Sequence, residues 1–189
     1  MGSRFPIRGC VPNLRVPSPR GTPPCLPESD ERKAHEGARH RGKGPPFTLP
    51  ASGGGAVSLK DFRSRKRAVY FFPRADTPGC TREALDFSRM RAAFAKSDTA
   101  VLGVSADPVS AHDRFTAKHG LKVPLAGDEA LDMLKAYGAW GEKRMYGRKF
   151  FGVIRKTVLI GADGRIARLW LKVKVEGHAA EVLAAASAL

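Results

Sequence analysis

Residues 71–80 read FFPRADTPGC and are the most informative segment of the chain. The apolar run over residues 68–72 follows the charged segment 63–67 and precedes Pro73, a pattern typical of a strand buried on both faces. Proline cannot donate a hydrogen bond to a sheet ladder, so the strand ends there. The sequence therefore predicts a strand, a turn, and a helix that begins close to Cys80.

The predicted helix start places a cysteine where an anion is favoured. Thr77 is expected as the N-cap, with its side chain accepting a backbone N–H, and Pro78 as the first helical residue, so that Cys80 is the third. Unpaired N–H groups and the helix dipole favour a thiolate there; such sites lower a free thiol's pKa from about 8.5 to roughly 3.5–7.5. An ordinary helix start with a small buried cysteine has the same pattern, so both interpretations stay open. No Cys-x-x-Cys spacing supports dithiol exchange.

Composition indicates a globular protein in a reducing compartment. The chain has 189 residues, of which 42% are apolar and 27% charged, enough to form one sizeable domain. No apolar run approaches the roughly 20 residues of a membrane span, so no membrane partner is expected. Cys10, Cys25 and Cys80 form no even, closely spaced framework, which favours the cytoplasm over a disulfide-stapled secreted domain.

Composition changes near residue 45. Residues 1–44 are rich in Pro, Arg and Gly and lack apolar periodicity, so they are predicted to be a disordered extension of a domain at 45–189. The extension holds nine Lys or Arg against four Asp or Glu, about +5 of the total net charge of +15. We favour a wrongly assigned start over an organelle-targeting peptide, whose acidic content would be unusual, or a genuine tail. Cys25, His35 and His40 lack tight metal-ligand spacing.

Strands and helices alternate from residue 45 onward. A hairpin is expected over 47–50 and 56–59 around a Ser-Gly-Gly-Gly turn. The remaining expected elements are strands over 68–72, 100–105, 152–160 and 165–170, and helices over 78 to 94 or 96, 108–118 with Asp107 as N-cap, 128–137 and 178–186. This order predicts an α/β protein with a thioredoxin-like fold, in which helices cover both faces of a mixed central sheet.

The spacing Pro73-x-x-x-Thr77-x-x-Cys80 resembles the active-site motif of the peroxiredoxins. The longer run TPGCTREA at 77–84 is similar to the bacterioferritin comigratory protein, or peroxiredoxin Q, branch of that family. The similarity continues through FTLP at 47–50, GVSAD at 103–107, YGAWGEK at 137–143, MYG at 145–147 and GVIRKT at 152–157, and covers essentially residues 45–189. The resemblance implies a monomeric, cofactor-free and metal-free peroxidase that reduces hydrogen peroxide and organic hydroperoxides.

The resemblance also assigns roles. It implies that Cys80 is the peroxidatic nucleophile, that Thr77 hydrogen-bonds the sulfur and the peroxide, that Pro73 shields the pocket, and that Arg155 supplies a guanidinium. Chemistry supports such a set, because breaking a peroxide bond needs an ionised sulfur and donors aimed at the departing oxygen. On its residues alone, Arg155 equally fits the solvent face of an alternating strand.

Leu85 departs from the family pattern. In the two-cysteine members of this branch a resolving cysteine stands at that position, five residues after the peroxidatic one. Five helical residues rise about 7.5 Å, beyond the roughly 4.4–6.8 Å between disulfide-linked Cα atoms, so even those members must unwind locally. The resemblance therefore implies a sulfenic acid reduced by thioredoxin, glutaredoxin or a low-molecular-weight thiol. Cys10 or Cys25 would be an alternative resolving thiol if the extension is flexible.

Two other function classes compete with the peroxidase. The net charge favours a module that binds nucleic acid or an acidic partner, through a basic cluster of Lys143, Arg144, Arg148, Lys149, Arg155 and Lys156. No zinc-finger spacing, helix-turn-helix or aromatic RNA-binding strand accompanies the cluster, so nucleic acid is not the expected partner. The missing resolving cysteine would also suit a holdase that kept the fold without rapid chemistry.

Overall fold

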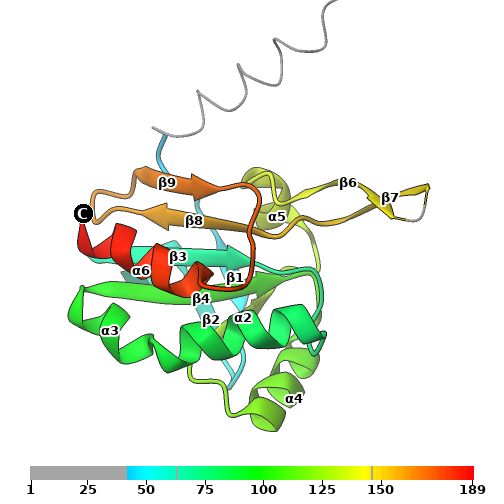
Figure 1. Ribbon diagram of the computed structural model, residues 1–189, viewed down its shortest axis with the longest axis horizontal. Coiled ribbons are helices and arrows are strands. Elements are labelled where there is room, and N and C mark those ends of the chain that lie inside the picture. Colours follow the sequence, from blue (N-terminus) through cyan, green and yellow to red (C-terminus); the bar gives the residue numbers. More distant parts are fainter. Residues whose placement is uncertain (1–41, 63, 146) are drawn as a thin grey trace, which may run out of the picture.

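A five-stranded mixed sheet runs through this computed structural model, which describes residues 42–189 without residues 63 and 146 (Figure 1). Its strands are β3 (Lys66–Phe71), β4 (Thr99–Ser105), β5 (Leu125–Gly127), β8 (Lys156–Ile160) and β9 (Ile166–Trp170). β4 pairs in parallel with β3 and β5, whereas β8 is antiparallel to β3 and β9. The order β5-β4-β3-β8-β9 places β3 in the centre, and the predicted mixed sheet is confirmed.

Successive side chains of β3 and of the residue after it point alternately into the two hydrophobic cores, one on each face of the sheet. Ala68, Tyr70 and Phe72 pack with one group of buried residues, whereas Val69 and Phe71 pack with the other. None of these five side chains is more than 1% exposed. Because successive strand residues point to opposite faces, a continuous apolar run requires that both faces be covered.

Helices cover both faces, as predicted (Figure 1). One face packs against α2 (Pro78–Arg89), α3 (Arg91–Lys96), α4 (Val109–His119) and α6 (His178–Ser187). The other packs against α5 (Asp132–Ala136), the hairpin of β1 (Thr48–Pro50) and β2 (Ala56–Ser58), and the short 3₁₀ helix η1 (Leu59–Phe62). The predicted hairpin and the terminal helix are therefore confirmed.

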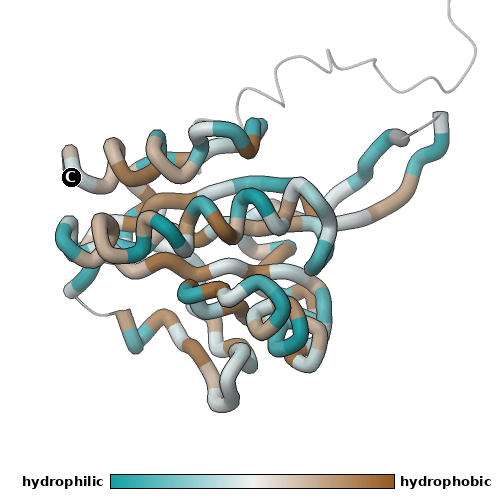
Figure 2. The backbone as a smooth tube through the Cα atoms, turned by 60° about the horizontal axis from the view of Figure 1, so that its bottom comes forward, coloured by the Kyte–Doolittle hydropathy of each residue, from teal (hydrophilic) through white to brown (hydrophobic). Residues whose placement is uncertain are grey.

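A second hairpin extends away from this body (Figures 1 and 2). It consists of β6 (Trp140–Met145) and β7 (Arg148–Val153), which pair only with each other. The prediction of one strand over 152–160 was wrong, because residues 154 and 155 separate β7 from β8. At this break the Ile154 N–H bonds the Ala139 carbonyl at 2.7 Å, so the chain leaves one sheet before it enters the other.

Two predicted helices begin or end elsewhere. The helix expected from 78 to 94 or 96 divides at Met90, where φ is −89° and ψ is 2°, into α2 and α3. The N-cap of α4 is Pro108 and not Asp107 as predicted. The reason is that the Asp107 carboxylate accepts the Ala75 N–H at 2.7 Å and is not available to α4.

The helix predicted over 128–137 is shorter, at Asp132–Ala136. Leu131 has a left-handed φ of 64°, which a continuing helix does not allow. Asp128 lies outside the helix, but its carboxylate accepts the Leu134 N–H at 2.7 Å. A carboxylate expected at the helix start thus caps the helix from a preceding loop.

The predicted extension at 1–44, with Cys10 and Cys25, falls almost entirely outside the described residues, and its boundary stays a prediction. Within the described residues, every helix is too short or too polar to cross a membrane.

Candidate active site

Cys80 lies near the carboxyl end of the central strand, buried at the start of a helix. β3 ends at Phe71, and α2 begins at Pro78, as the sequence predicts. Cys80 is the third residue of α2, is 2% exposed, and packs with the core residues of the helical face. It is the free cysteine of the described part of the chain. The fold thus holds one sulfur beside unpaired N–H groups of a helix start.

Arg155 joins Cys80 to a buried carboxylate. Its Nη2 donates a hydrogen bond to Cys80 Sγ at 3.2 Å, and its Nη1 donates to Glu83 Oε2. Glu83 follows Cys80 by three residues on α2, so the two side chains share a helix face, and it is 1% exposed. Glu83 was not predicted as a site residue, although its i, i+3 spacing from Cys80 was the available signal. The break between β7 and β8 places Arg155 here.

Burial and charge act against each other in this group. Burial raises the pKa of Glu83 to about 7, although the Arg155 guanidinium favours its ionised form. Burial would lower the pKa of Arg155, but Glu83 and Cys80 outweigh it and raise that pKa. The pKa of Lys143 is lowered, first by burial and then by the charge of Arg155, and the charge of Cys80 offsets part of this change. The sulfur is therefore near two cationic side chains, Arg155 and Lys143. Lys143 was predicted only as a member of the basic cluster and not as a residue that acts on Cys80.

Gly79 leaves room for the guanidinium. A Cβ at this position would lie 3.4 Å from Arg155 Nη2, at the tight end of ordinary contact. A larger side chain would displace the donor that reaches the sulfur.

Thr77 occupies the predicted N-cap position, with φ of −91° and ψ of 149°, but its side chain makes no cap hydrogen bond. Its hydroxyl instead donates to the Arg74 carbonyl at 3.2 Å, so the predicted acceptor role is wrong. Its carbonyl accepts the Thr81 N–H at 2.8 Å, which begins the helix ladder. Pro73 is half-buried in the turn after β3. The roles of both residues toward a peroxide remain predictions.

The turn before α2 is anchored to β4 and α4 by side chains that were not predicted as site residues, although Asp107 was predicted as a helix N-cap. Besides the Ala75 N–H, Asp107 Oδ2 accepts the Ser105 hydroxyl at 2.9 Å. That hydroxyl lies 3.2 Å from Nε2 of the buried His112. A partly buried polar chain thus runs from α4 to the backbone of the turn.

Asp76 provides a second anchor. Its φ of 58° is left-handed, a conformation that Asp tolerates better than most residues. Its carboxylate lies 2.6 Å from Lys118 Nζ and 2.7 Å from His119 Nε2, both in the last turn of α4. Hydrogen bonds from Lys118 and then His119 lower the pKa of Asp76. The turn that leads to Cys80 is therefore held to α4 from two sides.

A buried histidine lies near this site without touching the sulfur. His178 Nε2 is 2.7 Å from Thr157 Oγ1, and burial lowers the pKa of His178 to about 4. The histidine is thus neutral near pH 7.

The predicted basic cluster does not form one surface. Lys156 is buried, and its Nζ donates to the carbonyls of Tyr137 and Gly138 at 2.9 and 3.1 Å. Arg155 lies at Cys80, and the other four basic residues lie on the β6–β7 hairpin. No group of three His, Cys, Asp or Glu side chains in the described ranges is placed to hold a metal ion.

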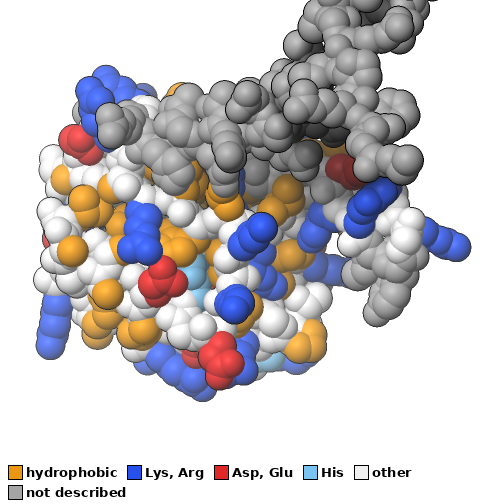
Figure 3. All heavy atoms as spheres, turned by 45° about the horizontal axis from the view of Figure 1, so that its top comes forward, with side chains coloured by type: hydrophobic (Ala, Val, Ile, Leu, Met, Phe, Trp, Pro, Cys, Tyr) orange, Lys and Arg blue, Asp and Glu red, His pale blue; other side chains and the backbone are white. Residues whose placement is uncertain are grey.

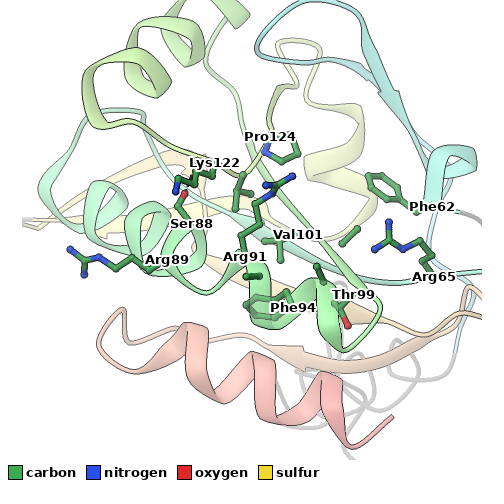
Figure 4. Close-up of a pocket in the computed structure, with 14 residues that line it drawn as sticks. Phe62, Arg65, Ser88, Arg89, Arg91, Phe94, Thr99, Val101, Lys122 and Pro124 are labelled. Carbon is green, nitrogen blue, oxygen red and sulfur yellow. Dashed lines mark hydrogen bonds between the residues drawn. The ribbon is translucent and has the colours of Figure 1, made fainter.

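A cleft of about 440 Å³ lies toward the other end of α2 (Figure 4). Phe94 and Val101 line it, with Arg91 and Lys122 among its basic residues, and it includes neither Cys80 nor Arg155. The candidate active site is therefore the buried Cys80–Arg155–Glu83 group and not this cleft.

Comparisons with known proteins agree on one family. A family profile described as AhpC/TSA matches residues 41–169. Peroxiredoxin Bcp of Xanthomonas campestris is 44% identical over 146 residues, covering 75% of this chain and 90% of that protein. Peroxiredoxin Bcp of Bacillus subtilis is 38% identical over 141 residues, with the same shares covered.

Solved structures of similar proteins share the fold. A structure of the Xanthomonas campestris bacterioferritin comigratory protein superposes with a TM-score of 0.72 at 40% identity, covering 75% of this chain and 90% of that one. A cysteine-to-serine variant of PrxQ from Xylella fastidiosa superposes with a TM-score of 0.73 at 37% identity, covering 79% and 97%. The family resemblance that the sequence motifs indicated is therefore confirmed by relatives and structures that cover about three quarters of this chain.

Proposed function

This chain belongs to the AhpC/TSA family and is a peroxiredoxin, and we propose that it works by a one-cysteine cycle centred on Cys80. Peroxiredoxins are thiol-dependent peroxidases with a thioredoxin-like fold. The observation that carries the proposal is the 3.2 Å hydrogen bond from Arg155 Nη2 to Cys80 Sγ at the start of α2. A charged donor at this distance favours a thiolate and stays in place when negative charge moves from the sulfur to an oxygen.

In the first step the Cys80 thiolate attacks one peroxide oxygen. An S–O bond forms, the O–O bond breaks, and Cys80 becomes a sulfenic acid. The departing oxygen takes its electron pair and a proton from solvent, and leaves as water or an alcohol. Arg155 stabilises the charge on that oxygen, and Glu83 holds the guanidinium in position. Thr77 and Pro73 line the approach in this proposal.

In the second step an external thiol restores the enzyme. Leu85 stands where a resolving cysteine would be, half-buried against the core, so α2 offers no second thiol. The external thiol attacks the sulfenic sulfur and releases water to give a mixed disulfide, and a second thiol then frees Cys80. Thioredoxin, glutaredoxin or a low-molecular-weight thiol would serve. We place this cycle in a monomeric domain at 45–189, in the cytoplasm.

The substrates we propose are hydrogen peroxide and organic hydroperoxides. The Xanthomonas campestris relative was studied for the reduction of alkyl peroxides, and it covers three quarters of this chain. Cys80 also packs among apolar side chains, which are compatible with an alkyl group.

The test compares the parent protein with Cys80→Ser. One equivalent of peroxide should give a Cys80 sulfenic acid that dimedone traps, and mass analysis should find no internal disulfide. Cys80→Ser should remove all peroxide consumption and keep the same circular dichroism spectrum. Unchanged consumption in Cys80→Ser would support the holdase instead. A bridge from Cys80 to Cys10 or Cys25, absent in the Cys10→Ser/Cys25→Ser control, would replace the one-cysteine cycle by an internal one.

A further inference from the structure

The β6–β7 hairpin extends outward from the body of the molecule (Figure 2), and its base lies close to Arg155 in the chain. β7 ends at Val153, two residues before Arg155. Lys143 Nζ donates to the Val153 carbonyl at 2.8 Å and so closes the base of the hairpin beside the catalytic guanidinium. The base of the hairpin therefore adjoins the segment that carries Arg155.

The pairing register divides the hairpin into two faces of different character. Lys143 lies opposite Phe150, and Arg148 shares the face of Phe150 because it is two residues away on the same strand. We call Lys143, Arg148 and Phe150 the site-side face. The opposite face carries Glu142, Arg144, Lys149 and Phe151, and on it Lys149 Nζ lies 3.1 Å from Glu142 Oε1. Each face therefore has one phenylalanine, but the acidic residue lies on the opposite face.

Lys143 identifies the site-side face as the one turned toward the active site. Its Nζ donates to the carbonyl of Val153, two residues before Arg155, and the charges of Arg155 and Cys80 have opposing effects on its pKa. At the base of the same face, a Cβ on Gly141 would lie 3.0 Å from Cδ1 of Ile154, the residue next to Arg155. The Phe150 ring covers Gly152, within 3.6 Å of where its Cβ would be, so it also lies on this face.

On this face Arg148 and Phe150 are exposed, whereas Lys143 is half-buried. Phe150 is 41% exposed and Phe151 66%, and these are the exposed phenylalanines of the described residues. Figure 3 shows Lys and Arg side chains gathered on the side of the molecule from which the hairpin extends. Aromatic and Arg side chains are enriched at protein–protein interfaces, and a rim of one charge selects a partner of the other.

We propose that the site-side face of Lys143, Arg148 and Phe150 docks an acidic thiol protein that reduces the Cys80 sulfenic acid. The inference rests on the proposed one-cysteine cycle, which requires that a thiol come from outside. A small thiol needs no docking surface. An exposed aromatic ring that shares a face with two cations, on a hairpin whose base lies beside Arg155, therefore favours a protein reductant. A second copy of this chain would bring a like-charged hairpin to the same face, and repulsion disfavours it.

The experiment follows each half of the cycle separately in the full chain. The protein is oxidised with one equivalent of peroxide and mixed with excess thioredoxin of net negative charge, and the rate constant of Cys80 reduction is measured by rapid quench and mass analysis. Arg148→Glu and Phe150→Ser change the site-side face. Arg144→Glu and Phe151→Ser make the same changes on the opposite face and are the matched controls. Reduction by dithiothreitol is the internal reference.

We expect each site-side change to lower the thioredoxin rate constant about tenfold or more, and each opposite-face change to leave it within about twofold. Dithiothreitol should reduce all five proteins at similar rates. Equal loss on both faces, no loss on either, or a parallel loss with dithiothreitol would overturn the inference. So would loss of single-stranded oligonucleotide binding in the site-side variants with an unchanged thioredoxin rate, which would identify a nucleic-acid surface. Failure of peroxide to form any sulfenic acid would instead refute the proposed function.

Discussion

Two buried titratable residues near Cys80 act on stability in opposite directions. The pKa of Glu83 is about 7 in the folded protein against 4.5 in the unfolded chain, so the folded state holds a proton that the unfolded state loses between these values. Its contribution to the free energy of unfolding is present below pH 4.5 and is lost as the pH rises to 7, by about 3 kcal/mol at most. The pKa of His178 is about 4 against 6.5. Its contribution is present above pH 6.5 and is lost as the pH falls to 4, by a similar amount.

Between pH 4.5 and 6.5, Glu83 therefore lowers the free energy of unfolding as the pH rises, whereas His178 raises it. The variant Glu83→Gln should separate the two effects. In this variant the Glu83 contribution is removed, whereas those of His178 and His112 remain, and burial lowers the pKa of both histidines. The free energy of unfolding should therefore rise with pH across this window. In the parent protein it should change less. Urea unfolding followed by tryptophan fluorescence at pH 4.5, 5.5 and 6.5 measures both. Parallel curves for parent and variant would show that Glu83 does not hold the extra proton.

At the scale of elements, the turn between β3 and α2 depends on α4 for its position. Asp107 accepts the Ala75 N–H and the Ser105 hydroxyl, and Asp76 contacts Lys118 and His119. The Asp107 bonds are partly buried and connect to the buried His112, whereas Asp76 is exposed. The first anchor is therefore the stronger, because exposed ion pairs contribute only about 0–1 kcal/mol.

Asp107→Ala should loosen this turn and slow peroxide reduction. It leaves the Ala75 N–H and the Ser105 hydroxyl without their acceptor, at a cost of about 1–3 kcal/mol in the free energy of unfolding. Stopped-flow fluorescence with peroxide should show a fall in kcat/KM of about tenfold at a temperature where the variant is still fully folded. Asp76→Asn, which keeps a residue that tolerates the left-handed φ, is the control with little expected effect. If both variants react with peroxide like the parent, the turn does not need this anchor.

The sequence predicted those elements whose own residues determine them. The run at 68–72 and the Thr77-Pro78 start gave β3 and α2, because apolar content and proline act locally. The prediction of Asp107 as the N-cap of α4 was wrong because its carboxylate accepts the N–H of a residue 32 positions away. The residues around Asp107 give no sign of that contact. The break at 154–155 was missed because an apolar and charged mixture still fits a strand, and the competing partner, Ala139, is remote in sequence. Motif resemblance located Arg155, but not its partner Glu83, since only the folded chain brings the break at 154–155 against α2.

For the whole molecule, the proposed lack of a resolving thiol predicts sensitivity to excess peroxide. Without a reductant, the Cys80 sulfenic acid should react again to a sulfinic acid, a gain of two oxygens or about 32 Da by mass analysis. Leu85→Cys supplies a thiol on α2 and should divert the sulfenic acid into an internal disulfide, with less sulfinic acid formed. A parent protein that accumulates a disulfide and no sulfinic acid would contradict the one-cysteine cycle.

Because the Arg155–Glu83 pair is buried and the hairpin is exposed, the two halves of the proposed cycle should respond differently to ionic strength. At physiological salt the Debye length is about 8 Å, so charges that interact through water are strongly screened, whereas a pair whose carboxylate is 1% exposed is screened little. Reaction with an uncharged peroxide should therefore keep its rate as salt increases, while the encounter with a charged reductant slows. The ionic composition of the cell would then set how long Cys80 stays oxidised without changing how fast it becomes so.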